Sequence, residues 1–221
     1  MFRLIFRSSF TALSLFIIGL SASSANAAEK VHTDKHSVVR WKAIGIIAGP
    51  ASPLRTPSYL PRPLVQGELV EMNFTINTAA KGLVYSTLAE YPGAIRSVKV
   101  TGSDWLIRMR APLGSGYAEI SNDDPDYGDS LALIANTPLL PGKTWYQVEI
   151  DMRNPGGPNP GIGPWQPFTS LALPRMPPPL GLMPSHGFYL GARRDQPGQA
   201  FDGDVYFGEI LSIGGVKSDD D

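Results

Sequence analysis

Proline and glycine interrupt this chain so often that long helices are difficult to build. The 221 residues include 21 prolines and 23 glycines, spread over the whole length. Proline removes a backbone donor and clashes with the preceding helical turn, and glycine is entropically costly inside a helix. The chain is therefore limited to short elements joined by many turns.

Between the turns, apolar side chains recur at every second residue, which is the period of a half-buried strand. The clearest runs are 69–76, 105–110 and 145–152. Shorter candidates lie at 39–47, 95–101, 117–121, 130–134, 188–192 and 205–213. About nine short strands with turn signals between them predict an all-β fold, a single antiparallel β-sandwich of the jelly-roll or concanavalin-like type.

The first and last strands share a pattern. Trp41–Ile47 and Val205–Leu211 are both apolar runs with one glycine in the middle, so we expect them to pair, with each glycine allowing a bulge or a close approach. Two long proline-rich loops are expected at 50–63 and 154–184. The second holds Trp165 and Phe168, and part of it is expected to pack across a sheet face.

The first 27 residues are typical of an export signal. Arg3 and Arg7 precede an apolar run at 10–20, and Ala25-Asn26-Ala27 has the form that signal peptidase cleaves. The predicted organisation is a cleaved signal at 1–27, a polar stub at 28–37, the β-sandwich at 38–215 and an acidic tail at 216–221. The apolar run is shorter than the ~20 residues that span a bilayer. We therefore expect export to the periplasm or the exterior, without stable membrane insertion after cleavage.

Composition excludes several function classes. The chain has no cysteine, so disulfides, thiol catalysis and cysteine-bound metals are absent. Acidic residues slightly outnumber basic ones, and no basic stripe appears in the sequence, which argues against a nucleic-acid partner. The close basic pairs Arg108/Arg110 and Arg193/Arg194 are interpreted as solvated strand edges or loops.

Glu149 and Asp151 are the catalytic candidates. Two residues apart on a strand, they share one face at a separation of about 7 Å, and paired carboxylates can divide the roles of glycoside cleavage. The string Glu149-Ile150-Asp151 resembles the E-[ILV]-D core of laminarinase-like glycoside hydrolases, which are β-sandwiches. That family carries a third acid just beyond, where this chain has Arg153 and Asn154, so Glu119 or Glu209 would have to supply it. The alternative is that both acids form the solvated face of an amphipathic strand.

The densest acidic segment suggests a calcium site. Calcium prefers several oxygen ligands, and the candidate ligands here are Asp123, Asp124, Asp126 and Asp129. The spacing lacks the glycine of the EF-hand loop. A tight hairpin turn explains the same residue types.

Aromatic side chains supply the binding hypothesis. Trp145 falls on the strand face opposite Tyr146, Val148 and Ile150, and Trp165 lies in the long loop. Exposed aromatics that cluster mark interaction sites, and such a surface would bind carbohydrate by stacking. Core packing is the alternative for every large aromatic.

Several segments together resemble a recurrent all-β domain of bacterial exported proteins, often found ahead of a PEP-CTERM sorting tail. The resembling segments, in the order of that domain, are 39–45, 67–76, 91–98, 120–124, 129–131 and 207–210. The resemblance implies an exported β-sandwich and assigns no catalytic residues. The chain shows no sorting motif after Gly215.

The sequence thus predicts an exported, non-enzymatic binding or structural module of the envelope or exterior. Its expected partner is a glycan or an envelope or extracellular protein, with no cofactor other than calcium. Two alternatives stay open, a glycan-active hydrolase using Glu149 and Asp151, and a calcium-dependent adhesion or matrix component.

Overall fold

The computed structural model describes residues 37–50, 59–110, 116–124, 128–138, 140, 143–154, 167–194 and 203–216. Its strands are β1 (Val38–Pro50), β2 (Leu69–Asn77), β3 (Leu83–Val84), β4 (Leu88–Pro92), β5 (Ile95–Thr101), β6 (Leu106–Arg110), β7 (Tyr117–Asp124), β8 (Gly128–Asn136), β9 (Thr144–Asn154), β10 (Ser185–Arg194) and β11 (Gly203–Val216). A 3-10 turn, η2 (Leu180–Leu182), lies in the described part of the second long loop. No helix in these ranges is long and apolar enough to cross a membrane.

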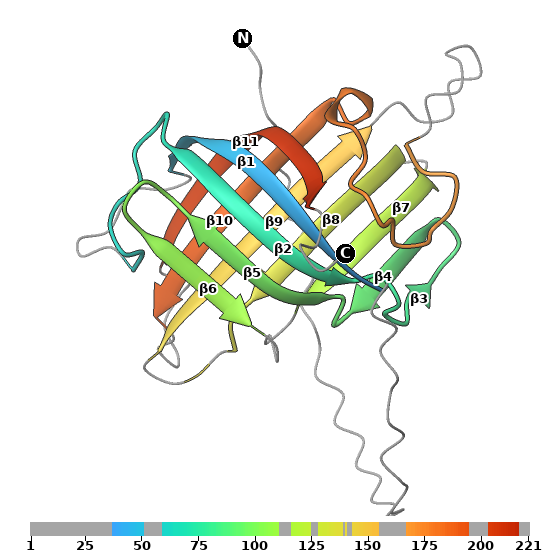
Figure 1. The fold of residues 1–221 in the computed structure, drawn as a ribbon, viewed down its shortest axis with the longest axis horizontal. Helices are drawn as coiled ribbons and strands as arrows, with labels where there is room; N and C mark the ends of the chain where they lie inside the picture. The colour runs from blue at the N-terminus through green and yellow to red at the C-terminus, as the bar shows by residue number, and fades with distance from the viewer. Residues whose placement is uncertain are drawn as a thin grey trace, which may run out of the picture. The chain divides into compact units, whose positions relative to one another are not determined.

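The eleven strands form one curled antiparallel sheet (Figure 1). Their order is β3-β4-β7-β8-β9-β10-β11-β1-β2-β5-β6. The all-β prediction is confirmed, and each of the nine predicted strands is present. β3 and β4 were not predicted. β3 has only two residues, and β4 has a small alanine at one of its two inner positions and proline at its end, so its alternation is weak.

The pairing of the first and last strands is confirmed. β1 and β11 are antiparallel neighbours, with Ile47 opposite Gly208 and Gly45 opposite Ile210. The register shifts between Ile44 and Gly45, which marks a bulge. This pairing joins the strands that begin the domain to the meander β7–β11, so the sheet is continuous from β3 to β6.

In every strand except the two-residue β3, alternate residues face a common interior. These inner side chains are almost fully buried and include Trp41, Ala43, Ile47, Met72, Phe74, Val98, Val100, Ile107, Met109, Ile120, Leu131, Leu133, Val148, Ile150, Met152, Phe188, Leu190, Tyr206 and Ile210. β5 contacts β8 across this interior. The core therefore lies inside the curl, and the other face of every strand is left for water or ligands.

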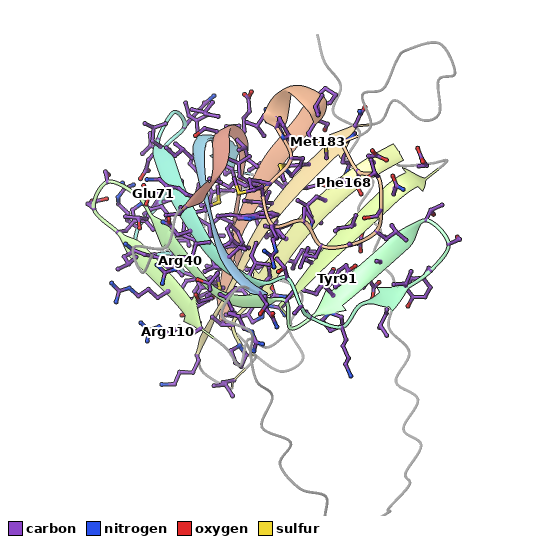
Figure 2. The ribbon with its side chains drawn as sticks, turned by 45° about the vertical axis from the view of Figure 1, so that its right-hand side comes forward. Arg40, Glu71, Tyr91, Arg110, Phe168 and Met183 are labelled. Atoms are coloured by element: carbon purple, nitrogen blue, oxygen red, sulfur yellow. The ribbon has the colours of Figure 1, made fainter. Side chains whose placement is uncertain are left out.

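The described part of the second long loop, residues 167–184, crosses the interior from β4 to β1. Tyr91 of β4 donates a hydrogen bond to the carbonyl of Leu171, and the indole of Trp41 in β1 donates one of 2.9 Å to the carbonyl of Arg175. Phe168 and Met183 are buried against the sheet (Figure 2). The expectation that part of this loop packs on the sheet is confirmed for these residues.

Candidate functional site

The outer face of β4 and β7–β11 gathers acidic and aromatic side chains from five strands, all of these except β8. In one row across the sheet, Glu119 of β7 follows Glu90 of β4, and Asp151 of β9 lies beyond Ala132 of β8. Gly187 and then Glu209 continue the row through β10 and β11. With neighbouring strands about 4.8 Å apart, the two acids suggested as a third carboxylate, Glu119 and Glu209, each lie about 10 Å from Asp151 in backbone position.

Glu149 occupies the next row, between hydrophobic neighbours. Its cross-strand partners are Ile134 on β8 and Tyr189 on β10. Burial raises the pKa of the Glu149 carboxyl above its ordinary value, and the negative charges of Asp151 and Glu119 raise it further, against smaller opposing effects of Arg153 and Gln147. A carboxyl in this setting gives up its proton at a higher pH than a solvated one.

Glu119 has a similar environment. Burial raises the pKa of its carboxyl, and so do the carboxylate of Glu90 directly opposite on β4 and that of Asp151. Like charges facing each other across two strands destabilise a sheet. The two half-buried acids Glu119 and Glu149 therefore lower the stability of the fold. Groups that cost stability in this way, with shifted pKa values, are common in functional sites.

Asp151 is held differently from its neighbours. Arg153, two residues further along β9, donates a 2.9 Å hydrogen bond from Nε to one carboxylate oxygen of Asp151 and approaches the other at 2.7 Å. In laminarinase-like enzymes a third acid follows the E-x-D pair. In this chain Arg153 occupies that position, and its guanidinium is ion-paired with Asp151. Glu149 and Asp151 thus share the outer face, as the spacing predicted, but with unequal surroundings.

The ring of Tyr189 extends over Gly191 on this face, because Gly191 has no side chain. A Cβ at position 191 would come within 2.8 Å of the Tyr189 ring. Phe207, opposite Tyr189 on β11, is tilted against it with ring centroids 5.7 Å apart. The Tyr189 ring that covers this glycine is only half-buried on the outer face. Tyr189 is therefore a platform on which a flat apolar group can stack.

Trp145 lies on the same outer face, as its position in the alternation predicted. The guanidinium of Arg193, opposite it on β10, sits 4.6 Å from the ring centroid in a cation–π contact. Trp145 is half-buried, whereas Trp41 and Trp105 are core residues with exposed fractions of 0% and 6%. Trp165, the other predicted ligand-binding residue, lies outside the described residues.

The proposed calcium ligands fall at the β7–β8 hairpin. Asp129 is buried, and its two carboxylate oxygens accept hydrogen bonds from the backbone N–H groups of Asp123 and Phe168. Asp123 is exposed with a φ of 55°, as a turn residue often is. Asp126 and the side chain of Asp124 lie outside the described residues. Asp129 thus ties the hairpin to the long loop, and a calcium site here stays a prediction.

Within the described ranges, no group of three or more His, Asp or Glu side chains is placed to hold a metal ion. His186, the one histidine in those ranges, has its Nδ1 2.6 Å from the carbonyl oxygen of Met183. Its ring is used to fix the end of the loop before β10.

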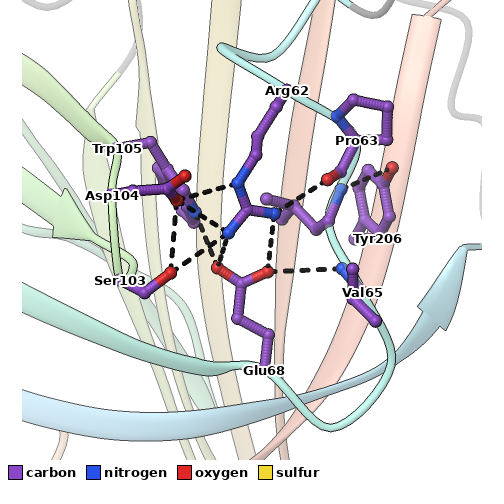
Figure 3. A network of polar contacts seen from close by, with 9 residues as sticks. Arg62, Pro63, Val65, Glu68, Ser103, Asp104, Trp105 and Tyr206 are labelled. Atoms are coloured by element: carbon purple, nitrogen blue, oxygen red, sulfur yellow. Dashed lines mark hydrogen bonds and ion pairs between the residues drawn. The ribbon is translucent and has the colours of Figure 1, made fainter.

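A second polar cluster was missed by the sequence reading. Glu68, at the end of the β1–β2 loop, accepts hydrogen bonds from both terminal nitrogens of Arg62, from the indole of Trp105 and from the backbone of Val65 (Figure 3). Arg62 also bonds Asp104. The cluster ties the β1–β2 and β5–β6 loops together, and since its groups are bonded to one another we assign it a structural role.

The sequence pointed to Glu149, Asp151 and Trp145, and the structure places all three on one face. The sequence could not show that Tyr189, Phe207 and Arg193 lie beside these three residues, because only the pairing of β9, β10 and β11 brings them together. In the stretch Phe188–Ala192, the only sequence signal was a glycine two positions after an aromatic residue, which puts both on the same face of a strand. No protein-family model, no curated protein and no solved structure gives a significant match to this chain. The resemblance to the exported all-β domain stays a prediction.

Proposed function

We propose that this chain is an exported, non-enzymatic binding module of the cell envelope or exterior, and that it binds carbohydrate on the outer face of β7–β11. The observation that carries the proposal is the half-buried Tyr189 ring that extends across Gly191, with Glu149 directly opposite it on the neighbouring strand. Sugar rings present apolar C–H faces that stack on aromatic rings, while their hydroxyls donate to carboxylates.

The surrounding side chains supply the remaining recognition chemistry. Phe207 extends the apolar surface beside Tyr189, and the pair of Trp145 and Arg193 offers a second aromatic with hydrogen-bond donors. A few polar groups converging on an apolar surface are the usual composition of a small-ligand site. The predicted export signal at 1–27 supports placing this surface in the periplasm or outside the cell, where free and envelope glycans occur.

We also infer that the curled sheet is folded over on itself as a β-sandwich of the jelly-roll type. The support is the contact of β5 with β8 across the interior, which sets two parts of the curled sheet face to face. In such an arrangement each part keeps one outer face that is free of core packing.

A glycan array with the purified protein, run with and without calcium, tests the binding function. A hit is then titrated against the Tyr189→Ala and Trp145→Ala variants. We expect each to weaken binding at least tenfold, while Tyr85→Ala leaves it unchanged, because Tyr85 is 55% exposed but lies in the turn between β3 and β4. Binding that survives both substitutions, or an array without any hit, would contradict the proposal.

A glycan-active hydrolase is the second candidate, favoured by one observation. Glu149 has a raised pKa, as a general acid needs, and Asp151 on the same face is ion-paired with Arg153. An enzyme would release reducing ends from the glycans that the array identifies, and Glu149→Gln would abolish the release. A binding module would retain the glycan without cleaving it. Calcium-dependent binding on the array would instead favour the adhesion or matrix function.

A further inference from the structure

The outer face of the other half of the sheet carries a cluster of cations. In one row across four strands, Lys42 of β1 is followed by Asn73, Lys99 and Arg108. In the next row, Arg40 is followed by Thr75, Ser97 and Arg110. The basic face, defined as Arg40, Lys42, Lys99, Arg108 and Arg110, spans about 14 Å from β1 to β6 at the usual strand spacing. Figure 2 labels Arg40 and Arg110 on it.

Little negative charge balances the basic face. Glu71 is the one carboxylate in the rows adjoining it, and it is paired with Lys42 and hydrogen-bonded to Asn73. Across the described residues, Arg40, Lys99, Arg108 and Arg110 make no ion pair. Lys99 lies directly opposite Arg108, an arrangement of like charges that weakens strand pairing. The positive potential of these exposed side chains is therefore directed into the solvent.

Exposed aliphatic side chains border the basic face on the same side of the sheet. Leu106 precedes Arg108 on β6 and is 41% exposed, and Leu69 of β2 is 57% exposed opposite Ile46. Leu211, at the bulge of β11, is 50% exposed. The face is thus amphipathic, with a cationic end and an aliphatic end. Exposed apolar groups that border a row of cations are typical of an interaction surface.

We propose that this face docks on a membrane surface rich in anionic lipids. The cations would meet headgroup phosphates, and the leucines would enter the boundary between headgroups and acyl chains. A soluble polyanion would match the charges but would leave the aliphatic end without a partner. Docking of this kind is peripheral, and it leaves the aromatic face on β7–β11 accessible. The inference is independent of carbohydrate binding.

Vesicle flotation tests the proposal with the purified protein. One vesicle preparation contains phosphatidylcholine with phosphatidylglycerol, and the other contains phosphatidylcholine alone. We expect binding to the anionic vesicles only, with release as salt is raised, because headgroup attraction is screened within a Debye length. Each removed cation should cost about fivefold in partition coefficient, so Arg108→Ser with Arg110→Ser should cost about 25-fold.

A charge-matched control separates the face from net charge. Lys143→Ser with Arg175→Ser removes the same charge from exposed positions outside the basic face, and should leave vesicle binding unchanged. A third variant, Leu69→Thr with Leu106→Thr, should weaken vesicle binding while leaving retention on dextran sulfate intact. Circular dichroism melts of all variants confirm that they fold.

Three results would overturn the proposal. The first is a lack of binding to anionic vesicles at low salt. The second is an equal loss in the basic-face and control variants. The third is retention on dextran sulfate together with vesicle binding that the leucine substitutions do not change, which would assign the face to a soluble polyanion.

Discussion

The ring of Phe188 on β10 covers Gly208, its direct partner on β11, and extends to Gly45 on β1. Any side chain at either glycine would overlap this ring. One aromatic residue therefore closes the junction where the first and last strands meet, and both strands need a glycine for it to lie there.

Gly208→Ala should destabilise the fold by about 3 kcal/mol, because an added Cβ must displace a buried ring and also lies close to the carbonyl of Ile46. Urea unfolding followed by tryptophan fluorescence measures the change. Gly214→Ala is the matched control on the same strand, since a Cβ there meets nothing within 4 Å. Equal stability of the two variants would show that Phe188 does not require Gly208.

Glu68→Gln should destabilise the protein at neutral pH by about 2 kcal/mol, since the Arg62 guanidinium loses its two-oxygen contact with the Glu68 carboxylate and keeps only the ion pair with the exposed Asp104. Burial alone would raise the pKa of Glu68, but hydrogen bonds from Trp105 and Arg62 outweigh it, and the net pKa is lowered. A lowered folded pKa adds stability that is complete above the ordinary value of 4.5 and is lost as the pH falls through the folded pKa.

Urea unfolding of wild type and Glu68→Gln as a function of pH checks this sign. The difference between the two proteins should be constant near neutrality and should shrink below pH 4.5. Glu209→Gln, at an exposed carboxylate, controls for the loss of one negative charge. A difference that grows on acidification would refute the assignment.

Glu149→Gln should stabilise the protein at neutral pH while weakening glycan binding. A carboxyl whose folded pKa is raised makes the folded state less stable once it is ionised, and this cost disappears as the pH falls below the ordinary value of 4.5. Melting temperatures at neutral and acidic pH, measured beside the glycan titration, test both parts. A variant that is destabilised at neutral pH would place Glu149 among structural residues.

Asp129→Asn should lower stability by about 1–2 kcal/mol whether or not calcium is present. The two carboxylate oxygens of Asp129 accept hydrogen bonds from two backbone N–H groups. In asparagine one of these oxygens is replaced by an NH2 group, which is itself a donor, so one of the two hydrogen bonds is lost. Melting curves with calcium and with a chelator give the measurement. A melting temperature of the wild type that falls on chelation would instead support the calcium site at Asp123–Asp129.

Local sequence patterns predicted the part of the candidate site that lies on β9, but not the residues that the neighbouring strands contribute. Alternation along β9 was enough to place Trp145, Glu149 and Asp151 on one face, because a strand has a fixed period of two. The partners of Glu149 come from elsewhere: Tyr189 is 40 positions further along the chain, and Glu119 is 30 positions earlier. Their proximity depends on strand order and register, which no local pattern encodes.

For this protein the sequence by itself determined the all-β class, nearly every strand and the meeting of the first strand with the last. Local periodicity and the shared glycine pattern of the two terminal strands carry that information. Only the tertiary structure decided that the strands form one curled sheet, that its outer surface divides into an acidic, aromatic face and a basic, aliphatic face, and that Arg153 binds Asp151. A surface is assembled from residues distant in sequence, so its chemistry appears only once the register of every strand is set.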